Sequence, residues 1–361
     1  MTTESPSKNL AAVNKCADVV ATIGARHLGV DPERLHFEGR QHLRWQFGTT
    51  PRVLLLGHFD TVWPIGTLET MPWSVDGGVV RGPGVFDMKA GVIQLFHALG
   101  TLDDLDGVVV LLNSDEEIGS PTSRSLIEEQ ARGLDAVLVL EGSGDGGALK
   151  TGRKGVSRYR LDVAGHAAHA GLEPDKGVNA LVELAHQVLA VSALGDSAAR
   201  TTVVPAVGSA GTTTNTVPAH ASVWCDVRVS TAAEQARVDR DLRALRPTLV
   251  GAALTVHGGP DRGPMEPESS TALFALAEVV AARLGLSKLG QCSVGGASDG
   301  NLTSALGTPT LDGLGAVGGG AHAIHEHAVE VYLEPRTRLL AALTAEILGG
   351  ALRRSKSPEQ S

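Results

Sequence analysis

The sequence predicts an α/β fold with a mostly parallel central sheet and a second, inserted domain. Three short apolar runs, at residues 53–57, 107–113 and 136–140, are each bounded by turn residues. Such runs are typical of strands buried in a parallel sheet. Helix-like segments separate them, which is the alternation of an α/β domain. The pattern changes over residues 155–262, where strands outnumber helices, and this predicts the inserted domain.

Size and composition agree with a soluble protein of two domains. The chain has 361 residues, of which 42% are hydrophobic and 20% charged, and its formal net charge is -9. No basic stripe is visible, which argues against a nucleic-acid partner. No apolar run reaches membrane-spanning length, and the first residues do not resemble a leader peptide. The three cysteines are scattered and odd in number, which is typical of a reducing compartment, so we expect a cytoplasmic protein. We also expect no membrane partner.

The first domain is expected to begin with an amphipathic helix. Leu10, Val13 and Ala17 are spaced for one helical face, which predicts a helix over residues 9–28. We expect these elements after it: a strand at 35–46, a strand at 53–57, a helix at 90–99, a strand at 107–113, a helix at 123–131 and a strand at 136–140.

The inserted domain has a periodicity of its own. Its expected elements are a strand at 156–163, a helix at 178–193, strands at 201–209 and 221–229, a helix at 232–249 and a strand at 253–257. The order β-α-β-β-α-β is a ferredoxin-like unit with both helices on one face of the sheet. We therefore expect one domain at 155–262 and another formed by 1–154 and 263–361.

The chain after the insertion is expected to complete the first domain. We expect a helix at 271–286, glycine-rich loops at 295–301 and 318–320, a helix at 334–348 and a disordered tail at 353–361.

Side chains able to bind metal follow each of the three buried strands. They are His58 and Asp60 after the first strand, Asp87 in the next glycine-rich loop, Glu116 and Glu117 after the second strand, and Glu141 after the third. The carboxyl ends of parallel strands form one edge of a sheet, where ligands bind. Imidazole and carboxylate groups are the ligands that zinc accepts in catalytic sites. Each motif alone is also compatible with an ordinary solvated turn, and only their combination favours a metal centre.

Together the motifs resemble a known family. The sequences GHFDTV at 57–62, GPG at 82–84, DMKAG at 87–91 and DEEIGS at 115–120 are similar to those of the dinuclear-zinc metallopeptidases. That family includes glutamate carboxypeptidase, aminoacylase, acetylornithine deacetylase and succinyl-diaminopimelate desuccinylase. The resemblance covers nearly the whole chain, and WPIGT at 63–67 and TGRKG at 151–155 look closest to the glutamate carboxypeptidase branch.

The resemblance implies two Zn²⁺ ions per chain, with Co²⁺ or Mn²⁺ as substitutes. The implied metal ligands are His58, Asp87, Glu117, Glu141 and His325. Asp87 would bridge the ions, with a cis peptide bond to Met88. His325 is preferred because Glu330 follows it at the family's spacing, and His322 and His327 remain alternatives. Glu116 would be the general base, with Asp60 supporting His58.

The resemblance also implies that the inserted domain is a lid through which two copies dimerise. His169 would stabilise the oxyanion, and Asn215 and Arg262 would hold the substrate carboxylate. Gly295 and Gly296 would line the same pocket. For Arg262, a surface charge at a hinge is the competing interpretation.

The implied activity is zinc-dependent cleavage of an amide bond in a small substrate. The substrate is an N-acyl amino acid or a peptide-like molecule that loses its C-terminal residue, as in glutamate carboxypeptidase. An aminoacylase or N-acyl-amino-acid deacetylase is the alternative within the family. An inactive binding protein of the same fold is the alternative outside enzymes, and the intact set of ligand types argues against it.

Overall fold

The structure, a computed structural model, describes residues 1–352 of the chain and divides into two compact units. Unit 1 comprises Met1–Gly152, Glu266–Val294 and the described chain from Ser298 onward. Unit 2 comprises Arg153–Met265 and Gly295–Ala297, so the predicted inserted domain at 155–262 falls within it. The tail predicted to be disordered, 353–361, lies outside the described residues.

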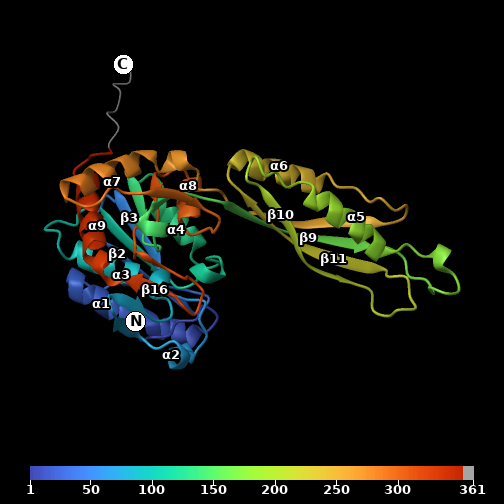
Figure 1. The fold of residues 1–361 in the computed structure, drawn as a ribbon, viewed down its shortest axis with the longest axis horizontal. Coiled ribbons are helices and arrows are strands. Elements are labelled where there is room, and N and C mark those ends of the chain that lie inside the picture. Colours follow the sequence, from blue (N-terminus) through green and yellow to red (C-terminus); the bar gives the residue numbers. More distant parts are fainter. Residues whose placement is uncertain (353–361) are drawn as a thin grey trace, which may run out of the picture. The chain divides into compact units, whose positions relative to one another are not determined.

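A six-stranded sheet forms the centre of unit 1, in the order β1-β2-β6-β3-β7-β14. Figure 1 labels its strands β2 and β3. Its strands are β1 (Glu33–Phe37), β2 (Arg40–Gln46), β3 (Val53–His58), β6 (Val108–Asn113), β7 (Ala136–Val139) and β14 (Thr310–Leu311). The four strands β6, β3, β7 and β14 are parallel, and β2 and β1 continue the sheet in antiparallel orientation. The predicted α/β fold with a mostly parallel sheet is therefore confirmed.

Helices cover both faces of this sheet, because its central strands are apolar on both sides. Val53 and Leu55 of β3 belong to one apolar cluster, and Leu54 and Leu56 belong to another. The first cluster includes side chains of α1 (Leu10–Leu28), α3 (Ala90–Leu99), α7 (Thr271–Arg283) and α9 (Leu333–Leu348). The second includes side chains of α4 (Arg124–Ala131) and α8 (Gly300–Ala305).

Two small sheets complete unit 1. One has the order β15-β16-β5-β4, and the other pairs β13 with β8. The bounds of these strands and of the short helix α2 are β15 (Gly318–Gly319), β16 (His327–Val329), β5 (Val79–Arg81), β4 (Ser74–Asp76), β13 (Gln291–Val294), β8 (Leu149–Arg153) and α2 (Thr67–Thr70). The antiparallel pairing of β16 with β5 brings the histidine-rich segment 322–327 beside the loop that carries Asp87.

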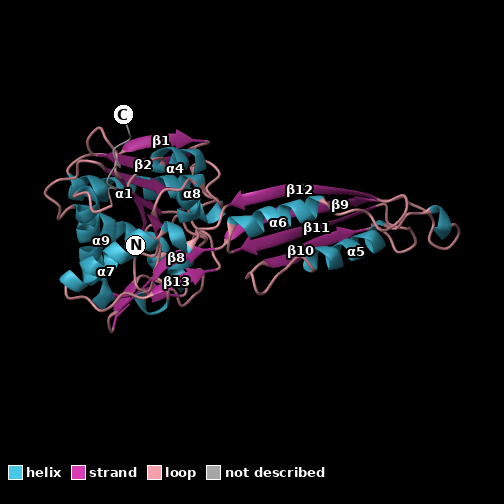
Figure 2. Cartoon of the chain, turned by 90° about the horizontal axis from the view of Figure 1, so that it is seen from above, coloured by secondary structure: helices cyan, strands magenta, loops and turns pink. Residues whose placement is uncertain are grey.

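Unit 2 is an antiparallel sheet of order β10-β11-β9-β12 with α5 and α6 on one face (Figure 2). Its elements are β9 (Gly155–Ala164), α5 (Ala180–Ser192), β10 (Thr202–Ala210), β11 (His220–Val229), α6 (Ala232–Arg243) and β12 (Ala253–Arg262). Alternate residues such as Tyr159, Leu161 and Val163 are buried against the helices. The predicted order β-α-β-β-α-β is observed.

Several local predictions are wrong. The strand expected at 253–257 extends to Arg262 as β12, and the loop expected at 318–320 contains strand β15. The single strand expected at 35–46 is the hairpin β1–β2, because Glu38 and Gly39 turn the chain with φ values of 49° and 78°. Helix α6 ends at Arg243 rather than at 249, since Pro247 disfavours helical geometry in the residue before it. Part of the expected glycine-rich loop at 295–301 instead begins α8.

No helix within residues 1–352 is both long enough and apolar enough to cross a membrane.

Candidate metal centre

The candidate site lies at the carboxyl ends of the parallel strands of unit 1. His58 is the last residue of β3 and is in register with Asn113, the last residue of β6. Glu116 and Glu117 follow β6 in a short 3₁₀ turn, and Glu141 follows β7. Parallel strands end at one edge of the sheet, so these side chains converge although they are far apart in the sequence.

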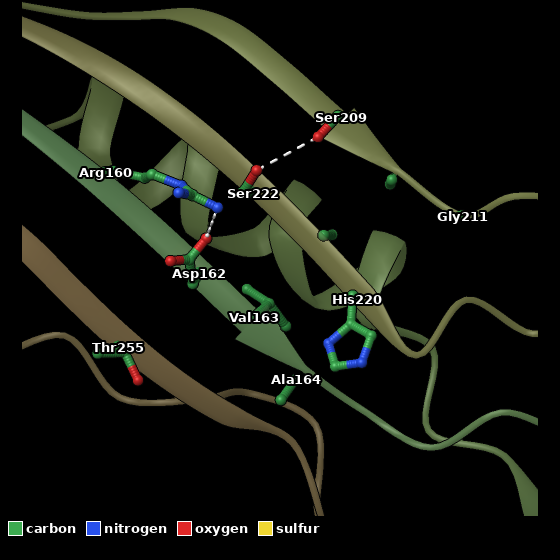
Figure 3. Close-up of a pocket in the computed structure, with 11 residues that line it drawn as sticks. Arg160, Asp162, Val163, Ala164, Ser209, Gly211, His220, Ser222 and Thr255 are labelled. Carbon is green, nitrogen blue, oxygen red and sulfur yellow. Dashed lines mark hydrogen bonds and ion pairs between the residues drawn. The ribbon is translucent and has the colours of Figure 1, made fainter.

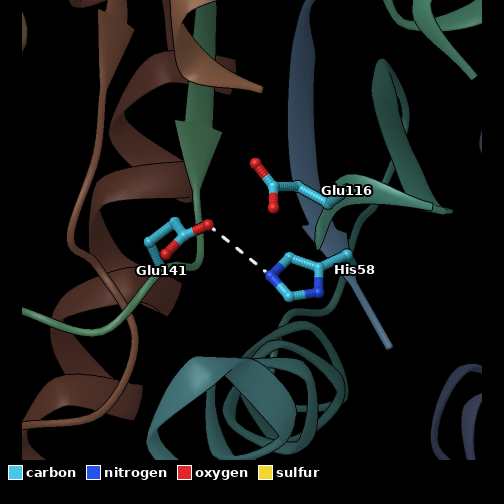
Figure 4. Close-up of side chains that lie close together, drawn as sticks. All are labelled: His58, Glu116 and Glu141. Atoms are coloured by element: carbon cyan, nitrogen blue, oxygen red, sulfur yellow. Dashed lines mark ion pairs between the residues drawn. The ribbon is translucent and has the colours of Figure 1, made fainter. Parts of the chain in front are cut away.

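His58 is almost fully buried and is oriented from both sides of its ring. Its Nδ1 lies 3.0 Å from the backbone oxygen of Asp60. Because a carbonyl only accepts, Nδ1 of the neutral ring carries the hydrogen and Nε2 keeps its lone pair. That Nε2 lies 3.2 Å from Asp87 Oδ1. It also lies 3.6 Å from Oε1 of Glu141, the contact drawn in Figure 4. Burial lowers the pKa of His58, but Asp60, Asp87 and Glu141 together raise it well above its ordinary value.

Asp87 contacts two histidines through different oxygens. Oδ1 faces His58, whereas Oδ2 lies 3.3 Å from Nε2 of His322. Burial raises the pKa of Asp87, but the two histidines outweigh that effect and hold the pKa far below its usual range. The peptide bond from Asp87 to Met88 is cis, as the resemblance implied.

Glu117 contacts His322, the same histidine that faces Oδ2 of Asp87. Its Oε2 lies 3.1 Å from Nε2 of His322, whose pKa is raised to about 10 by Asp87 and Glu117. Burial raises the pKa of Glu117 itself. The other oxygen, Oε1, is buried and has no hydrogen-bond partner among the described residues. A buried carboxylate oxygen without a donor is suited to accept a cation.

The donor atoms fit a dinuclear metal centre. The ligand atoms of His58, Glu116 and Glu141 lie within 4.8 Å of one another, and so do those of His58, Asp87 and Glu117. Imidazole nitrogen and carboxylate oxygen together suit zinc, whereas Mg²⁺ and Ca²⁺ centres use oxygen ligands. A carboxylate with one oxygen toward each histidine, as in Asp87, matches a group shared between two ions.

Asp60 fixes the turn that carries the two glutamates. Its carboxylate accepts hydrogen bonds from the backbone N–H groups of Glu116 and Glu117, each at 3.2 Å. It also accepts a 2.6 Å hydrogen bond from the hydroxyl of Ser7, and its Oδ1 lies 3.4 Å from His58 Nδ1. All of these groups surround a carboxylate with no exposed surface. Asp60 therefore orients the turn of residues 116–117 as well as the ring of His58.

A second buried aspartate, Asp115, holds the same turn from the other side. Its carboxylate accepts hydrogen bonds from the backbone N–H and hydroxyl of Thr122, both at 2.7 Å, and from the hydroxyl of Ser123. The sequence analysis missed Ser7 and assigned no role to Asp115. The sequence Ser5-Pro6-Ser7 before the first helix carries no signal of this contact, which depends on the tertiary structure.

His325 is the ligand expected from the sequence in segment 322–327, but His322 is the histidine that lies in the acidic cluster. The ring of His322 contacts Asp87 and Glu117, as described above. His325 is exposed, and its ring packs beside Gly320, where an added Cβ would lie 2.8 Å from its Cδ2. His327, the other alternative, lies in β16 and contacts the backbone oxygen of His325. The β16–β5 pairing sets this arrangement, and spacing along the chain does not reveal it.

The remaining predicted site residues lie in unit 2: His169, Asn215, Arg262, Gly295 and Gly296. Nδ1 of His169 accepts hydrogen bonds from the backbone N–H groups of Gly171 and Leu172, each at 3.1 Å. The hydrogen of its neutral ring is therefore on Nε2, which can donate to an anionic oxygen.

The other members of this set are placed by backbone contacts. The backbone oxygen of Asn215 accepts from Ala170 N–H, and that of Gly296 accepts from the Arg153 guanidinium. Arg262 is 4% exposed at the end of β12, and Gln235 donates to its backbone oxygen.

A hollow of 460 Å³ lies on the face of the unit 2 sheet opposite its helices (Figure 3). Its polar groups contact one another: Arg160 and Asp162 form a 2.8 Å ion pair, and the hydroxyls of Ser209 and Ser222 are 3.3 Å apart. No cluster of metal-binding side chains is found there among residues 1–352. Both groups of described side chains that could hold a metal ion lie in unit 1.

Comparison with known proteins gives matches over most of the chain. Residues 54–346 match peptidase family M20/M25/M40. Carboxypeptidase G2 of Pseudomonas sp. (strain RS-16) is 31% identical over 310 residues, which cover 82% of this chain and 74% of that protein. Succinyl-diaminopimelate desuccinylase of Corynebacterium glutamicum is 30% identical over 167 residues, 45% of this chain and 44% of that protein.

Solved structures show the same fold. Aminopeptidase PepT from Bacillus cereus has a TM-score of 0.77 at 19% identity, covering 96% of this chain and 95% of that one. An M20 family metallo-carboxypeptidase from Sulfolobus solfataricus has a TM-score of 0.68 at 17% identity, covering 96% and 97%. At these identities the likeness concerns the fold alone.

Proposed function

The chain belongs to peptidase family M20/M25/M40, as a metallohydrolase that cleaves amide bonds, and we propose that it is a dinuclear zinc carboxypeptidase. Its substrate is a peptide-like molecule or an N-acyl amino acid, and we propose that the group released is a C-terminal amino acid such as glutamate. The match to carboxypeptidase G2 over 82% of the chain supports this choice within the family.

The observation that carries the proposal is the two-sided contact of Asp87. We assign His58, Asp87 and Glu141 to one ion and Asp87, Glu117 and His322 to the other. The distances of 3.2 and 3.3 Å from the Asp87 oxygens to the two histidines support this division. When bound, the ions would supply Lewis acidity to the scissile carbonyl and a lowered pKa to the attacking water.

Glu116 is the proposed general base. It shares a turn with Glu117, and its carboxylate lies within 4.8 Å of the ligand atoms of His58 and Glu141. A carboxylate next to the reacting water can accept its proton and pass that proton to the leaving amine. The hydrogen bonds from the Glu116 and Glu117 N–H groups to Asp60 hold the base and its neighbouring ligand in one fixed turn.

Unit 2 is proposed to supply the substrate-binding groups and to act as a lid. Nε2–H of His169 would donate to the developing oxyanion, which is worth a factor of about 10²–10³ in kcat for comparable donors. Arg262 would pair with the carboxylate of the leaving amino acid, since a guanidinium binds a carboxylate through two N–H groups. Asn215, Gly295 and Gly296 would line the same pocket.

Unit 2 is also the proposed dimer interface. Strand β10 is at an edge of its sheet, and its Val204 and Val207 side chains are 51% and 65% exposed. An exposed apolar edge strand is a template for pairing with a second chain. A Val207→Lys variant that stays dimeric in light scattering would contradict this interface.

The proposed location is the cytoplasm, which the odd and scattered cysteines of the sequence support.

A hydrolysis screen of the zinc-loaded protein, with a chelated sample as control, tests the function. The panel holds N-acetyl, N-benzoyl and N-aminoacyl derivatives of the common amino acids, and the released amine is measured. Chelator-sensitive release of glutamate or aspartate from bulky acyl donors would confirm the carboxypeptidase. Preferred release of other amino acids from acetyl donors would make the protein an aminoacylase. Absence of hydrolysis with two ions bound would overturn the proposed activity and leave a binding protein of this fold.

A further inference from the structure

Glu326 is a buried carboxylate surrounded by N–H donors, and the proposed mechanism does not use it. The residue has no exposed surface, and it lies in the turn between His322 and β16. Four hydrogen bonds reach its two oxygens: Trp63 Nε1 at 2.8 Å and Gly84 N at 2.9 Å to Oε2, and Phe86 N at 2.9 Å and Asp87 N at 3.0 Å to Oε1.

These donors come from the segments that carry the proposed metal ligands. Trp63 follows His58 and Asp60, and the three backbone donors belong to the loop that ends at Asp87. One of them is the N–H group of Asp87 itself, the residue whose two oxygens face the two histidines. Glu326 therefore joins three stretches of the chain at one carboxylate.

The segment of Glu326 also carries His322. The turn between them is held by hydrogen bonds from Ala323 N–H to Gly320 O at 2.9 Å and from Glu326 N–H to Ala323 O at 2.8 Å. The backbone between His322 and Glu326 is thus short and hydrogen-bonded. Because Glu326 holds the backbone of Asp87, it also sets where Asp87 Oδ2 lies relative to His322.

Burial raises the pKa of Glu326 above its ordinary value, and the four hydrogen bonds to its carboxylate offset only part of that effect. Hydrogen bonds from N–H groups to an ionised acceptor are roughly twice as strong as those between neutral groups. Lys89, almost fully buried, adds a positive charge near Glu326, while its ammonium donates to the backbone oxygens of Thr3 and Pro83.

We propose that Glu326 is a positioning residue that sets Asp87 against His322 and thereby the affinity of the second metal position. The inference rests on the dinuclear centre proposed above. Both oxygens of Glu326 accept hydrogen bonds from N–H groups of the protein, so it would act through Asp87 and His322.

Glu326→Gln is the principal test, and Glu330→Gln is the matched control. Glutamine keeps the volume of Glu326 but offers one acceptor oxygen, so its NH₂ group faces two of the four donors. Glu330 lies in the same segment, is exposed and undergoes the same loss of charge. Zn²⁺ affinity is measured for both ions by competition calorimetry, together with kcat and KM.

We expect the second Zn²⁺ ion to bind about 10–100-fold more weakly in Glu326→Gln, a range typical of groups that orient metal ligands. The first ion shares Asp87 but not His322, so it should lose less affinity than the second. The kcat should fall with little change in KM, and added Zn²⁺ should restore part of kcat. Glu330→Gln should match the wild type in all four quantities.

If Glu326→Gln lowers the thermal stability but leaves the affinities for both Zn²⁺ ions unchanged, the inference is overturned and Glu326 has only a structural role. If that variant does not fold, Trp63→Phe removes a single donor from the same carboxylate, and an unchanged second affinity there would also overturn it. A wild-type protein that binds two ions without hydrolysing an amide would refute the proposed function, while the affinity comparison would still test Glu326. A wild-type protein that binds only one ion would overturn both.

Discussion

Nε2 of His322 lies 3.3 Å from Oδ2 of Asp87, on the carboxylate oxygen opposite to the one that faces His58. Two histidines from distant parts of the chain are therefore separated by one carboxylate. The first comes from the end of a central strand, and the second from a turn held by a small peripheral sheet. This relationship makes Asp87 the centre of the proposed site.

Replacing His322 should remove one metal ion, whereas replacing His325 should not. His322→Ala deletes the ring that contacts Asp87 and Glu117, so we expect one Zn²⁺ per chain and a loss of kcat of at least about 100-fold. His325→Ala changes an exposed ring outside these contacts and serves as the control. Metal content by mass spectrometry and kcat check the pair. If His325→Ala loses an ion and His322→Ala does not, His325 is the metal ligand, as expected from the sequence.

Glu116→Gln should abolish hydrolysis while leaving both ions bound. Glutamine keeps the shape of the side chain but cannot accept the proton of the attacking water, and general bases contribute about 10²–10⁴ in rate. Single-turnover rates and metal content are the measurements. A variant that loses an ion together with its activity would identify Glu116 as a ligand beside His58 and Glu141, instead of a base.

Ser7→Ala should weaken the metal centre, although Ser7 lies near the start of the chain, before the first helix. The variant removes a buried 2.6 Å hydrogen bond to Asp60, which also receives the N–H groups of Glu116 and Glu117. Hydrogen bonds to charged groups are worth about 1.5–3 kcal/mol, so stability and Zn²⁺ affinity should both fall.

Ser5→Ala is the matched control for Ser7→Ala, because Ser5 donates a 2.6 Å hydrogen bond to the backbone oxygen of Phe59 and not to Asp60. It should lower stability alone, by about 1 kcal/mol. Equal Zn²⁺ affinities of the two variants in a titration would refute a role for Ser7 in the centre.

Removing the metal should lower the stability of unit 1. The chelated protein keeps several buried acidic groups at one site, and bound ions stabilise the folded state by about 2.7 kcal/mol at a concentration 100 times the Kd. The thermal transition should therefore fall with a chelator and rise again with added Zn²⁺. In the His322→Ala protein the same additions should produce a smaller shift. If the transition temperature of the wild type changes with neither the chelator nor added Zn²⁺, no ion binds the folded protein.

Unit 2 should lose stability in acid through Glu234. Hydrogen bonds from Arg237 and Thr201 lower the pKa of Glu234 to about 2, from an ordinary value of 4.5. Because the folded state prefers the ionised form, the contribution is complete above pH 4.5 and is lost as the pH falls from 4.5 to about 2.

Denaturant unfolding of Glu234→Gln against pH checks this contribution. The variant should be less stable than the wild type at pH 7, and the gap should close between pH 4.5 and 2. Glu173→Gln, in the same unit with a carboxylate that is 55% exposed, is the control and should show no such change. A gap that stays constant with pH would contradict the lowered pKa of Glu234.

Much of the fold could be predicted because it depends on local patterns. The apolar runs at β3, β6 and β7 determined the parallel sheet, and the separate periodicity of 155–262 determined the order β-α-β-β-α-β. The hairpin at Glu38 and Gly39 was missed because the apolar alternation continues through both of its strands. The small sheet β15-β16-β5-β4 was missed because its strands have only two or three residues, too few for a periodic signal.

The sequence by itself determined which side chains lie at the ends of the parallel strands. His58, Glu117 and Glu141 each follow a recognisable apolar run, and a parallel sheet necessarily gathers such ends at one edge. Only the tertiary structure decided which of three neighbouring histidines completes the cluster and which buried groups hold it. His322, Ser7 and Glu326 reach the centre through contacts between segments distant in the chain. The geometry of those contacts is set by chain packing, which local spacing does not encode.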